Sequence, residues 1–517
     1  MVASSESCQN LDDSMSTNSK NISDDDFEVQ NDQDSKDSFS IESKDINTGD
    51  FDVENSARTS NMPREERKAR DFEFYYAIQL DETQSYRSIF WRDSRARKSY
   101  MKFHDVIVFD VTYKINNFSM SFAPLTGVNQ HRQSILFGCA LLSNEQEETF
   151  SWLFTQWRNC MWNQPPGAII TDQDSAICNA IAKKNSQTYH RYCKWHLELH
   201  EYEHLRSLQC AHPTFMKDYN KWAKQSKTIE ESEESWINLR DKYEQVFKEQ
   251  LTETQKNMIK SWKWVKNMYE KRRHWVKAYR KQTFFAGMKY SQRSESMNSY
   301  FDGHVNSNTP LSEFVEQYEN AISNHPNVED SEDLVSMTTT PDFTDMHTLE
   351  AHAQRVYCIN ILKIFQVEFG KKLHCQHYKK VVKEDDEILY EVDCGESVKP
   401  HIVDVNISTL FCKCSCAKFE TGGIPCKYIL YIMKQKLLLK VILDVYILPR
   451  WTLSVRYKTT YVFCGENGKV VDINEIDKVK EITELEAWTL RGELNKLYKK
   501  VITRRDLYAT IEKVIQE

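Results

Sequence analysis

Residues 106–110 read Val-Ile-Val-Phe-Asp, and residues 168–172 read Ala-Ile-Ile-Thr-Asp. Each stretch is a short, continuous apolar run that ends on an aspartate, which is typical of a buried strand. The chain between them predicts two further strands, at 118–128 and 134–142, and then a helix at 147–162. Because a strand that follows a helical crossover pairs in parallel with the strand before it, we expect 168–172 to lie parallel to 106–110.

This arrangement brings Asp110 and Asp172 together at the carboxyl edge of the sheet, where ligands of such sheets bind. Two neighbouring carboxylates repel each other, and a divalent cation such as Mg²⁺ or Mn²⁺, which prefers carboxylate oxygens, relieves that repulsion. A pair of such ions could hold the attacking and leaving oxygens of a phosphoryl displacement. An aspartate after a strand is also a common helix cap, and Asp172 is placed to cap a helix predicted from Ser175.

The remaining chain predicts several further elements. Residues 64–100 have the apolar spacing of a helix, 188–192 that of a fifth strand, and 481–517 that of a charged terminal helix. Pro124 and Gly127 indicate that the second strand is irregular or lies at an edge.

Composition excludes several classes of protein. The low counts of 13 Gly and 11 Pro exclude collagen-like and Pro/Gly-rich low-complexity chains. A length of 517 residues, 40% of them apolar, favours two or three globular domains. No apolar run is long enough to span a membrane, and the 14 cysteines follow no export signal, so we expect reduced thiols or metal ligands rather than disulfides. Residues 1–60 hold 15 acidic and 4 basic residues, which predicts a disordered acidic tail. That tail is either a solubilising linker or an activation-type segment that uses Phe27, Phe39 and Phe51.

The opposite charge is concentrated at 256–293, which holds 12 Lys or Arg and the single acid Glu270, with aromatic residues interleaved. This pattern favours phosphate contacts together with base stacking. The alternative is an amphipathic helix whose aromatics pack inward and whose basic side chains face water. The candidate DNA-binding residues are Lys256, Lys260, Lys263, Lys266, Lys271, Arg272, Arg273, Lys277, Arg280 and Lys281.

Several long stretches carry a family resemblance. They are IFWRDSRARKSYMKFHDVIVFDVTY (89–113), HRQSILFGCALLSNEQEETFSWLF (131–154), AIITDQDSAICNAI (168–181), HRYCKWH (190–196), FFAGMKYSQRSESMNSYFDGHV (284–305) and YILPRWT (446–452). With them the chain resembles the Mutator-like transposase superfamily and, more closely, the plant far-red-impaired-response family of transcription factors derived from it.

The resemblance implies an α/β fold: a ribonuclease-H-like DDE transposase core at 105–305 with an all-helical insertion at about 200–290. Asp110, Asp172 and Glu295 match the three acids of the DDE triad, with magnesium as the implied ion. Cys193 and His196 match a Cys-x-x-His motif, which we interpret as a packed hydrogen-bonding pair because two ligands do not close a zinc site.

A second motif resembles the family's SWIM-type zinc finger, Cys-x-Cys-x(n)-Cys-x-His. Cys414, Cys416 and Cys426 match its three cysteines, but Tyr428 stands where the histidine is expected. A phenol is a poor zinc ligand, so the fourth ligand is doubtful. Cys412 and His401 are candidate substitutes, and three thiolates at alternate positions would crowd one tetrahedron.

The expected organisation is a tail at 1–60, a helical lead-in at 61–104, the core, a helical or linker region at 306–400, the zinc finger at 401–435 and a helical region at 436–517. Many family members begin with a Cys/His-rich zinc module, and we expect this chain to lack it because Cys8 is the only cysteine before residue 139.

The resemblance implies a nuclear transcription regulator in light-responsive gene control. It would bind DNA, related family members or both, as a homodimer or heterodimer, without a membrane. The alternative is an active DDE transposase that cuts and joins DNA with Mg²⁺. We prefer the regulatory interpretation because the family kept the fold after domestication, and enzymatic activity stays open.

Overall fold

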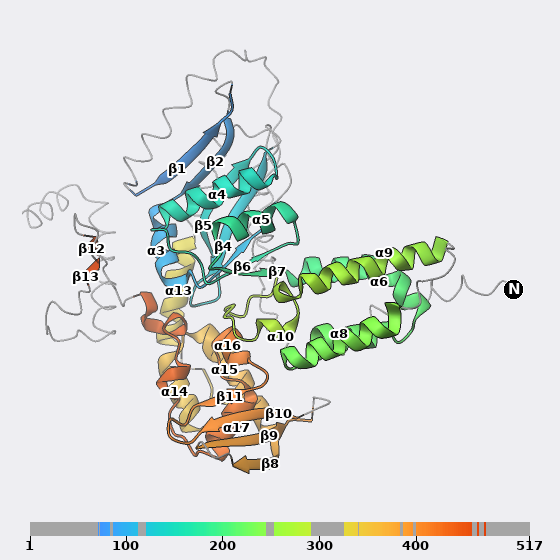
Figure 1. The fold of residues 1–517 in the computed structure, drawn as a ribbon. Helices are drawn as coiled ribbons and strands as arrows, with labels where there is room; N and C mark the ends of the chain where they lie inside the picture. Colours follow the sequence, from blue (N-terminus) through green and yellow to red (C-terminus); the bar gives the residue numbers. More distant parts are fainter. Residues whose placement is uncertain are drawn as a thin grey trace, which may run out of the picture.

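The computed structural model describes residues 71, 73–82, 86–111, 120–244, 253–290, 325–339, 341–382, 386–395, 400–456, 463–464 and 470–471. They form a sheet covered by helices, a helical arm that projects from one edge of the sheet, and a C-terminal module below it (Figure 1). Residues 1–60, Glu295 and the helix predicted at 481–517 lie outside the described residues. Within the described part, no helix is both long and apolar enough to cross a membrane.

The sheet has seven strands in the order β1-β2-β5-β4-β3-β6-β7. β3, β6 and β7 run parallel to one another, and the other neighbours are antiparallel. The strands predicted at 106–110, 134–142, 168–172 and 188–192 are therefore confirmed. The strands are β1 (Tyr75–Leu80), β2 (Tyr86–Arg92), β3 (Val106–Phe109), β4 (Ser121–Val128), β5 (Ser134–Leu142), β6 (Ala168–Thr171) and β7 (Tyr189–Tyr192).

The helix predicted at 64–100 is wrong for much of its length, since β1 occupies 75–80 and β2 occupies 86–92, and among the described residues of this stretch only those of α3 (Ser94–Phe103) are helical. Ile89, Phe90 and Trp91 are all buried, because β2 lies inside the sheet and both of its faces are covered. A strand of that kind loses the alternation that distinguishes it from a helix. The second predicted strand is irregular, as expected, with a register shift after Leu125, but it lies in the centre of the sheet rather than at an edge.

The central strands bury side chains on both faces of the sheet. Ile107, Phe109 and Ile169 pack in one cluster with α4 (Glu147–Cys160) and α5 (Ser175–Lys184). Their neighbours Val106 and Val108 belong to a second cluster that continues into the C-terminal module. The continuous apolar runs that end on Asp110 and Asp172 are thus explained by burial on two sides.

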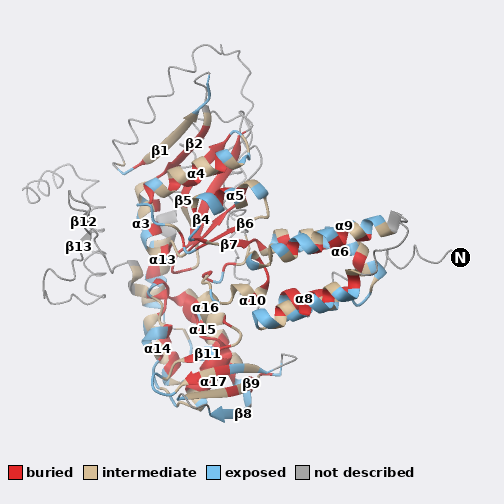
Figure 2. Ribbon diagram, in the orientation of Figure 1, coloured by how far each residue is buried: buried red, intermediate tan, exposed pale blue. Residues whose placement is uncertain are grey.

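The helical arm follows β7, and its helices carry buried residues of their own (Figure 2). These residues form a separate core that is rich in aromatic side chains. Trp222 and Trp236 lie 4.8 Å apart between ring centroids, and Trp236 stacks on Trp262 and Tyr269. A π-helical turn at Lys221–Gln225 and a 3-10 turn at Arg272–His274 connect the arm's helices. The helices are α6 (Lys194–Ala211), α7 (Phe215–Asn220), α8 (Ile229–Tyr243), α9 (Glu253–Glu270) and α10 (Lys277–Arg280).

The C-terminal module combines helices with a four-stranded antiparallel sheet of order β11-β10-β9-β8. The expectation of a helical or linker region up to residue 400 is wrong beyond 375, because β8 pairs with β9 and β9 pairs with β10 in one sheet. Between 436 and 456 the described chain forms 3-10 turns rather than the expected α-helix, and β12 (Phe463–Cys464) pairs with β13 (Val470–Val471). The module contains α13 (His325–Thr338), α14 (Thr348–Val356), α15 (Ile359–Lys371), β8 (Gln376–Val382), β9 (Glu387–Asp393), β10 (His401–Asn406), β11 (Cys412–Cys414), α16 (Lys418–Gly422) and α17 (Lys427–Gln435).

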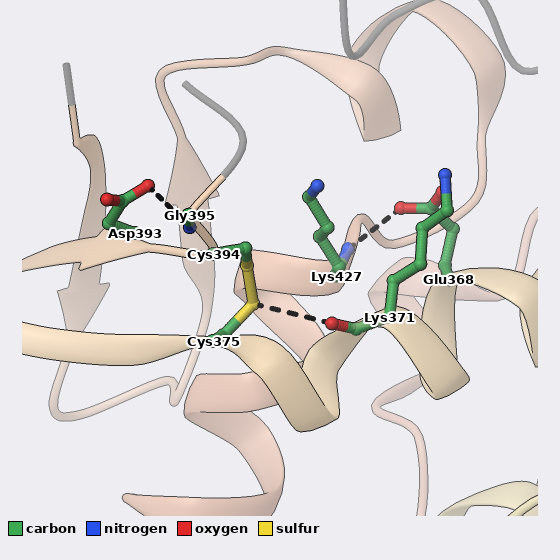
Figure 3. Close-up of a disulfide and its surroundings, with 7 residues drawn as sticks. All are labelled: Glu368, Lys371, Cys375, Asp393, Cys394, Gly395 and Lys427. Carbon is green, nitrogen blue, oxygen red and sulfur yellow. Dashed lines mark hydrogen bonds between the residues drawn. A yellow bond between two sulfur atoms is a disulfide. The ribbon is translucent and has the colours of Figure 1, made fainter. Parts of the chain in front are cut away.

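One pair of cysteines contradicts the expectation of reduced thiols. Cys375 and Cys394 form a disulfide with a Cα–Cα distance of 4.0 Å (Figure 3). The register of β8 and β9, which pairs Gln376 with Asp393, places these two cysteines opposite each other at the next position. Sequence spacing alone could not show this pairing, because it depends on the hairpin register.

Candidate functional site

The two strand-ending aspartates stand side by side. β3 and β6 pair in parallel with Val106 opposite Ala168 and Val108 opposite Ile170, so the same register places Asp110 opposite Asp172. Neighbouring strands are separated by about 4.8 Å, which brings the two backbones within reach of a shared ion. Asp110 is 9% exposed and Asp172 is partly buried. The third expected acid, Glu295, lies outside the described residues.

Asp172 does not cap the following helix. The N-cap of α5 is Asp174, whose carboxylate accepts the N–H of Ile177 at 2.9 Å, while Asp172 accepts the N–H of Asp174 at 3.1 Å. Burial raises the pKa of Asp172 above its ordinary value, and the Asp174 N–H and His196 oppose that shift. A neighbouring cation is what such a partly desolvated carboxylate favours.

The Cys-x-x-His motif faces the same edge. Cys193 is buried and precedes α6. Burial alone would lower the pKa of His196, but a hydrogen bond with Cys193 and the charges of Asp110 and Asp172 raise it. Among the described residues, no third His, Cys, Asp or Glu joins this pair in a compact ligand group. The geometry therefore agrees with a hydrogen-bonding pair beside the carboxylates.

The basic window divides into exposed and structural residues. On α9, Lys256, Lys260, Lys263 and Lys266 are exposed at helical spacing, while Trp262 is buried in the arm's core. Trp275 is buried as well, so neither of these two rings can stack on a nucleic-acid base. For these two residues, the alternative interpretation of an amphipathic helix with inward-packed aromatic side chains is the one that the structure supports.

The C-terminal end of the window is tied into the protein. Arg272 pairs with Glu233 at 2.7 Å and lies over the ring of Tyr269. Lys281 donates to the backbone carbonyls of Lys227 and Ser415, at 2.7 and 2.6 Å. Arg272, Lys277, Arg280 and Lys281 are only partly exposed, whereas Arg273 is exposed. The exposed members of the predicted DNA-binding set are thus the four α9 lysines and Arg273, while Lys271 is partly exposed.

A cluster of three cysteines forms a second candidate site. The sulfur atoms of Cys414, Cys416 and Cys426 all lie within 4.8 Å of one another. Cys414 ends β11, Cys416 lies in the turn after it, and Cys426 is the N-cap residue of α17. Soft thiolates at this separation fit zinc, which takes sulfur ligands at about 2.3 Å.

A tight turn returns the chain to Cys426. Gly423 ends α16 with φ 77°, and a Cβ at this position would lie 2.5 Å from Leu448 and 2.6 Å from Trp451. The φ and the close approach both require glycine.

Within the cluster, one thiol is the acidic one. Hydrogen bonds from the thiols of Cys414 and Cys426 hold the pKa of Cys416 well below its ordinary value, whereas burial raises the pKa of the other two. Lys277, from α10, is close to this thiolate: burial lowers the pKa of Lys277 to about 8, and Cys416 opposes the shift.

Cys412 is not part of the cluster, which corrects one of the proposed ligand sets. It is buried two residues before Cys414 on the same strand, and its Sγ donates to the carbonyl of Leu410 at 3.6 Å. Burial raises the pKa of Cys412 to about 12, which favours a neutral thiol. The group of sulfurs that lie within 4.8 Å of one another therefore holds Cys414, Cys416 and Cys426 without Cys412.

Tyr428 and His401 lie together beside the sulfurs. Tyr428 is 3% exposed, and its ring centroid lies 4.4 Å from that of His401. Both residues line a cavity of about 20 Å³ whose wall also includes Cys416 and Cys426.

Comparison with known proteins agrees with the resemblance. Residues 106–199 match the MULE transposase domain family. Among relatives in Arabidopsis thaliana, the chain is similar to Protein FAR1-RELATED SEQUENCE 5, at 36% identity over 76% of the chain and 48% of that protein. It is similar to Protein FAR-RED IMPAIRED RESPONSE 1 at 31% over 76% of the chain and 46% of that protein, and to Protein FAR1-RELATED SEQUENCE 9 at 30% over 75% and 68%. The chain spans about half the length of the first two.

Proposed function

We propose that this chain, which belongs to the transposase-derived FAR1-related family of plant proteins, is a nuclear regulator of transcription that binds DNA in light-responsive gene control. The observation that carries DNA binding is the row of exposed lysines on α9. Related family members, or a second copy of the chain, are the proposed protein partners.

The proposed architecture has two functional units. The first is a ribonuclease-H-like core at 105–305, interrupted by the helical arm, and the order β5-β4-β3-β6-β7 with its parallel end supports it. The second is a SWIM-type zinc finger at 401–435, supported by the three-cysteine cluster and the helix α17 that follows it. Zinc is the ion that this donor set fits.

The DNA-binding proposal predicts a salt-dependent, largely sequence-independent affinity. Replacing Lys256, Lys260, Lys263 and Lys266 together by Glu is expected to weaken binding about tenfold or more on every duplex and to flatten the salt dependence by roughly one unit of slope per lost phosphate contact. Fluorescence anisotropy of the full chain at several salt concentrations measures both quantities.

The control replaces Lys379 and Lys380, which are exposed on β8 in the C-terminal module, by Glu. A pair substitution on α9, Lys260 and Lys263 to Glu, matches its charge change. Equal loss from the two pairs would mean that net charge, and not the α9 face, governs affinity. Unchanged binding in the quadruple variant would contradict the proposal.

A second candidate function is Mg²⁺-dependent DNA cleavage, favoured by the register that places Asp110 opposite Asp172. In that case the full chain should bind Mn²⁺ at this edge. Asp110→Asn with Asp172→Asn should abolish both that binding and any cleavage, because the two carboxylates supply the ligands. Electron paramagnetic resonance of Mn²⁺ and nicking of a labelled duplex are the measurements.

The control for this candidate is Asp174→Asn, which removes a neighbouring charge and keeps an N-cap residue of similar strength. This variant should keep most of the ion affinity. If the double variant binds Mn²⁺ as well as the natural chain does, the carboxylate edge is not an ion site.

A further inference from the structure

We propose that His401, which precedes the cysteine motif, supplies the fourth ligand of the zinc site and takes the role that Tyr428 cannot fill. The inference rests on the proposed zinc finger and specifies its ligand shell. The juxtaposition that carries it is the imidazole of His401 beside Tyr428, on the wall of the cavity that Cys416 and Cys426 also line.

Sheet register brings His401 to this place. In the antiparallel pair of β10 and β11, Val403 lies opposite Cys414 and Val405 opposite Cys412. The pairing continues past the end of β11, since the N–H of Ser415 donates to the carbonyl of Ile402 at 2.8 Å. The next position along this register places His401 opposite Cys416.

The tyrosine marks the position that a motif histidine would occupy. The ring centroids of His401 and Tyr428 are 4.4 Å apart, with an interplanar angle of 34°. An imidazole therefore already stands next to the place from which the motif's own histidine would reach the metal. The cavity between these groups, of about 20 Å³, is large enough for one small ion or water.

Apart from the two cysteines, the other side chains that line the cavity are poor candidates for the fourth zinc ligand, because they are already hydrogen-bonded or lack a suitable donor atom. The Glu368 carboxylate accepts from the Lys418 ammonium at 2.7 Å and from the Lys427 N–H at 2.9 Å (Figure 3 shows the Lys427 contact). The lysines carry positive charge, and the phenol of Tyr428 is a weak zinc ligand at neutral pH. His401 is the lining residue whose neutral form offers a nitrogen lone pair.

A neighbouring hydroxyl orients the ring. Nδ1 of His401 lies 3.1 Å from Oγ of Ser415, and that oxygen also accepts the N–H of Ile402 at 3.0 Å. When Nδ1–H donates to Ser415, the lone pair is on Nε2, as in metal sites whose histidines are fixed by an outer hydrogen bond. His401 stands beside the tight group of three sulfurs rather than inside it, so closing the shell requires its ring to swing from Tyr428 toward them.

The test measures zinc affinity of the full chain by chelator competition and the coordination sphere by absorption of the Co²⁺-substituted protein. His401→Ala is expected to weaken zinc binding about 100-fold, since one of four ligands contributes roughly a quarter of the total binding free energy. It should also remove the nitrogen contribution from the Co²⁺ spectrum. His401→Cys should restore tight binding, and Tyr428→Phe, which keeps the ring, should change nothing.

A second pair of variants separates the two histidine positions. Tyr428→His should rescue His401→Ala and add little to the natural chain, because one shell holds four ligands. If His401→Ala leaves zinc affinity unchanged while Cys414→Ser abolishes binding, the inference is overturned and the zinc site stands. If the natural chain binds no zinc, the zinc finger proposal itself fails.

Discussion

Replacing Cys414 by Ser is expected to weaken zinc binding strongly and to lower the stability of the C-terminal module. A zinc site of four ligands contributes roughly 10–16 kcal/mol in total, so one lost thiolate weakens binding about 100-fold or more. A 100-fold weakening removes about 2.7 kcal/mol of stabilisation at saturating zinc. Zinc content and the unfolding temperature with and without added zinc measure the two effects.

Cys412→Ser is a closely matched control for this change. Both cysteines are buried on β11 and face the same way, but Cys412 lies outside the group of three sulfurs. A serine at 412 can still donate to the carbonyl of Leu410, so zinc affinity should be that of the natural chain. Equal zinc loss in the two variants would show that disturbing the strand, rather than removing a ligand, is responsible.

Replacing Arg450 by Met is expected to lower the free energy of unfolding by about 1–3 kcal/mol, because the buried carbonyl of Val128 loses its charged donor, while Asp105, whose side chain is 33% exposed, stays in contact with water. The Arg450 side chain is 6% exposed, pairs with Asp105 and donates to the carbonyl of Val128 at 2.8 Å. Its guanidinium also lies over the rings of Phe103 and Trp451. Chemical denaturation of the two proteins measures the difference.

The position of Arg450 explains why the effect is large. Arg450 comes from a 3-10 turn of the C-terminal module, whereas Asp105 directly precedes β3 and Val128 is the last residue of β4 in the seven-stranded sheet. Loss of the contacts that Arg450 makes with Asp105 and Val128 should also make unfolding less cooperative, because the C-terminal module can then separate from the sheet. The control is Arg240→Met, which breaks the pair with Asp241 on the surface of the arm and should cost less than about 1 kcal/mol. A similar loss of unfolding free energy in both variants would contradict the proposed role of Arg450 in joining the C-terminal module to the sheet.

The helical arm and the cysteine cluster are physically connected. Lys281 donates to the carbonyl of Ser415, and the N–H of Phe285 donates to the carbonyl of Thr421 at 2.8 Å. Both acceptors lie in the segment that carries the cysteines. The C-terminal part of the basic window therefore holds the cysteine segment against the arm, which accounts for the partial burial of that part of the window.

Local sequence patterns were sufficient to predict the parallel strand pair, the aspartates at its ends and the three clustered cysteines. Each of these depends on local information. A short apolar run ending on an acid specifies a buried strand, and the spacing of Cys414, Cys416 and Cys426 fits one turn and one helix start. The sequence also identified the family, because long motifs keep their order along the chain.

Other features could be seen only in the folded chain: the first two strands, the disulfide, the neighbours of the cysteine cluster and the exposure of the basic residues. Strand β2 was not distinguished from a helix because burial on both of its faces removes the alternation that identifies a strand. The edge strand β1 is only partly buried, and its place in the sheet depends on pairing with β2. The disulfide of Cys375 with Cys394 and the placing of His401 beside Cys416 depend on hairpin register, which joins residues far apart in the chain. The basic window looked uniform in sequence, yet packing against the arm and the cysteine segment leaves the α9 lysines exposed and encloses Lys281. The exposure of a basic side chain depends on which segment packs against its helix, and the sequence of the helix does not specify that segment.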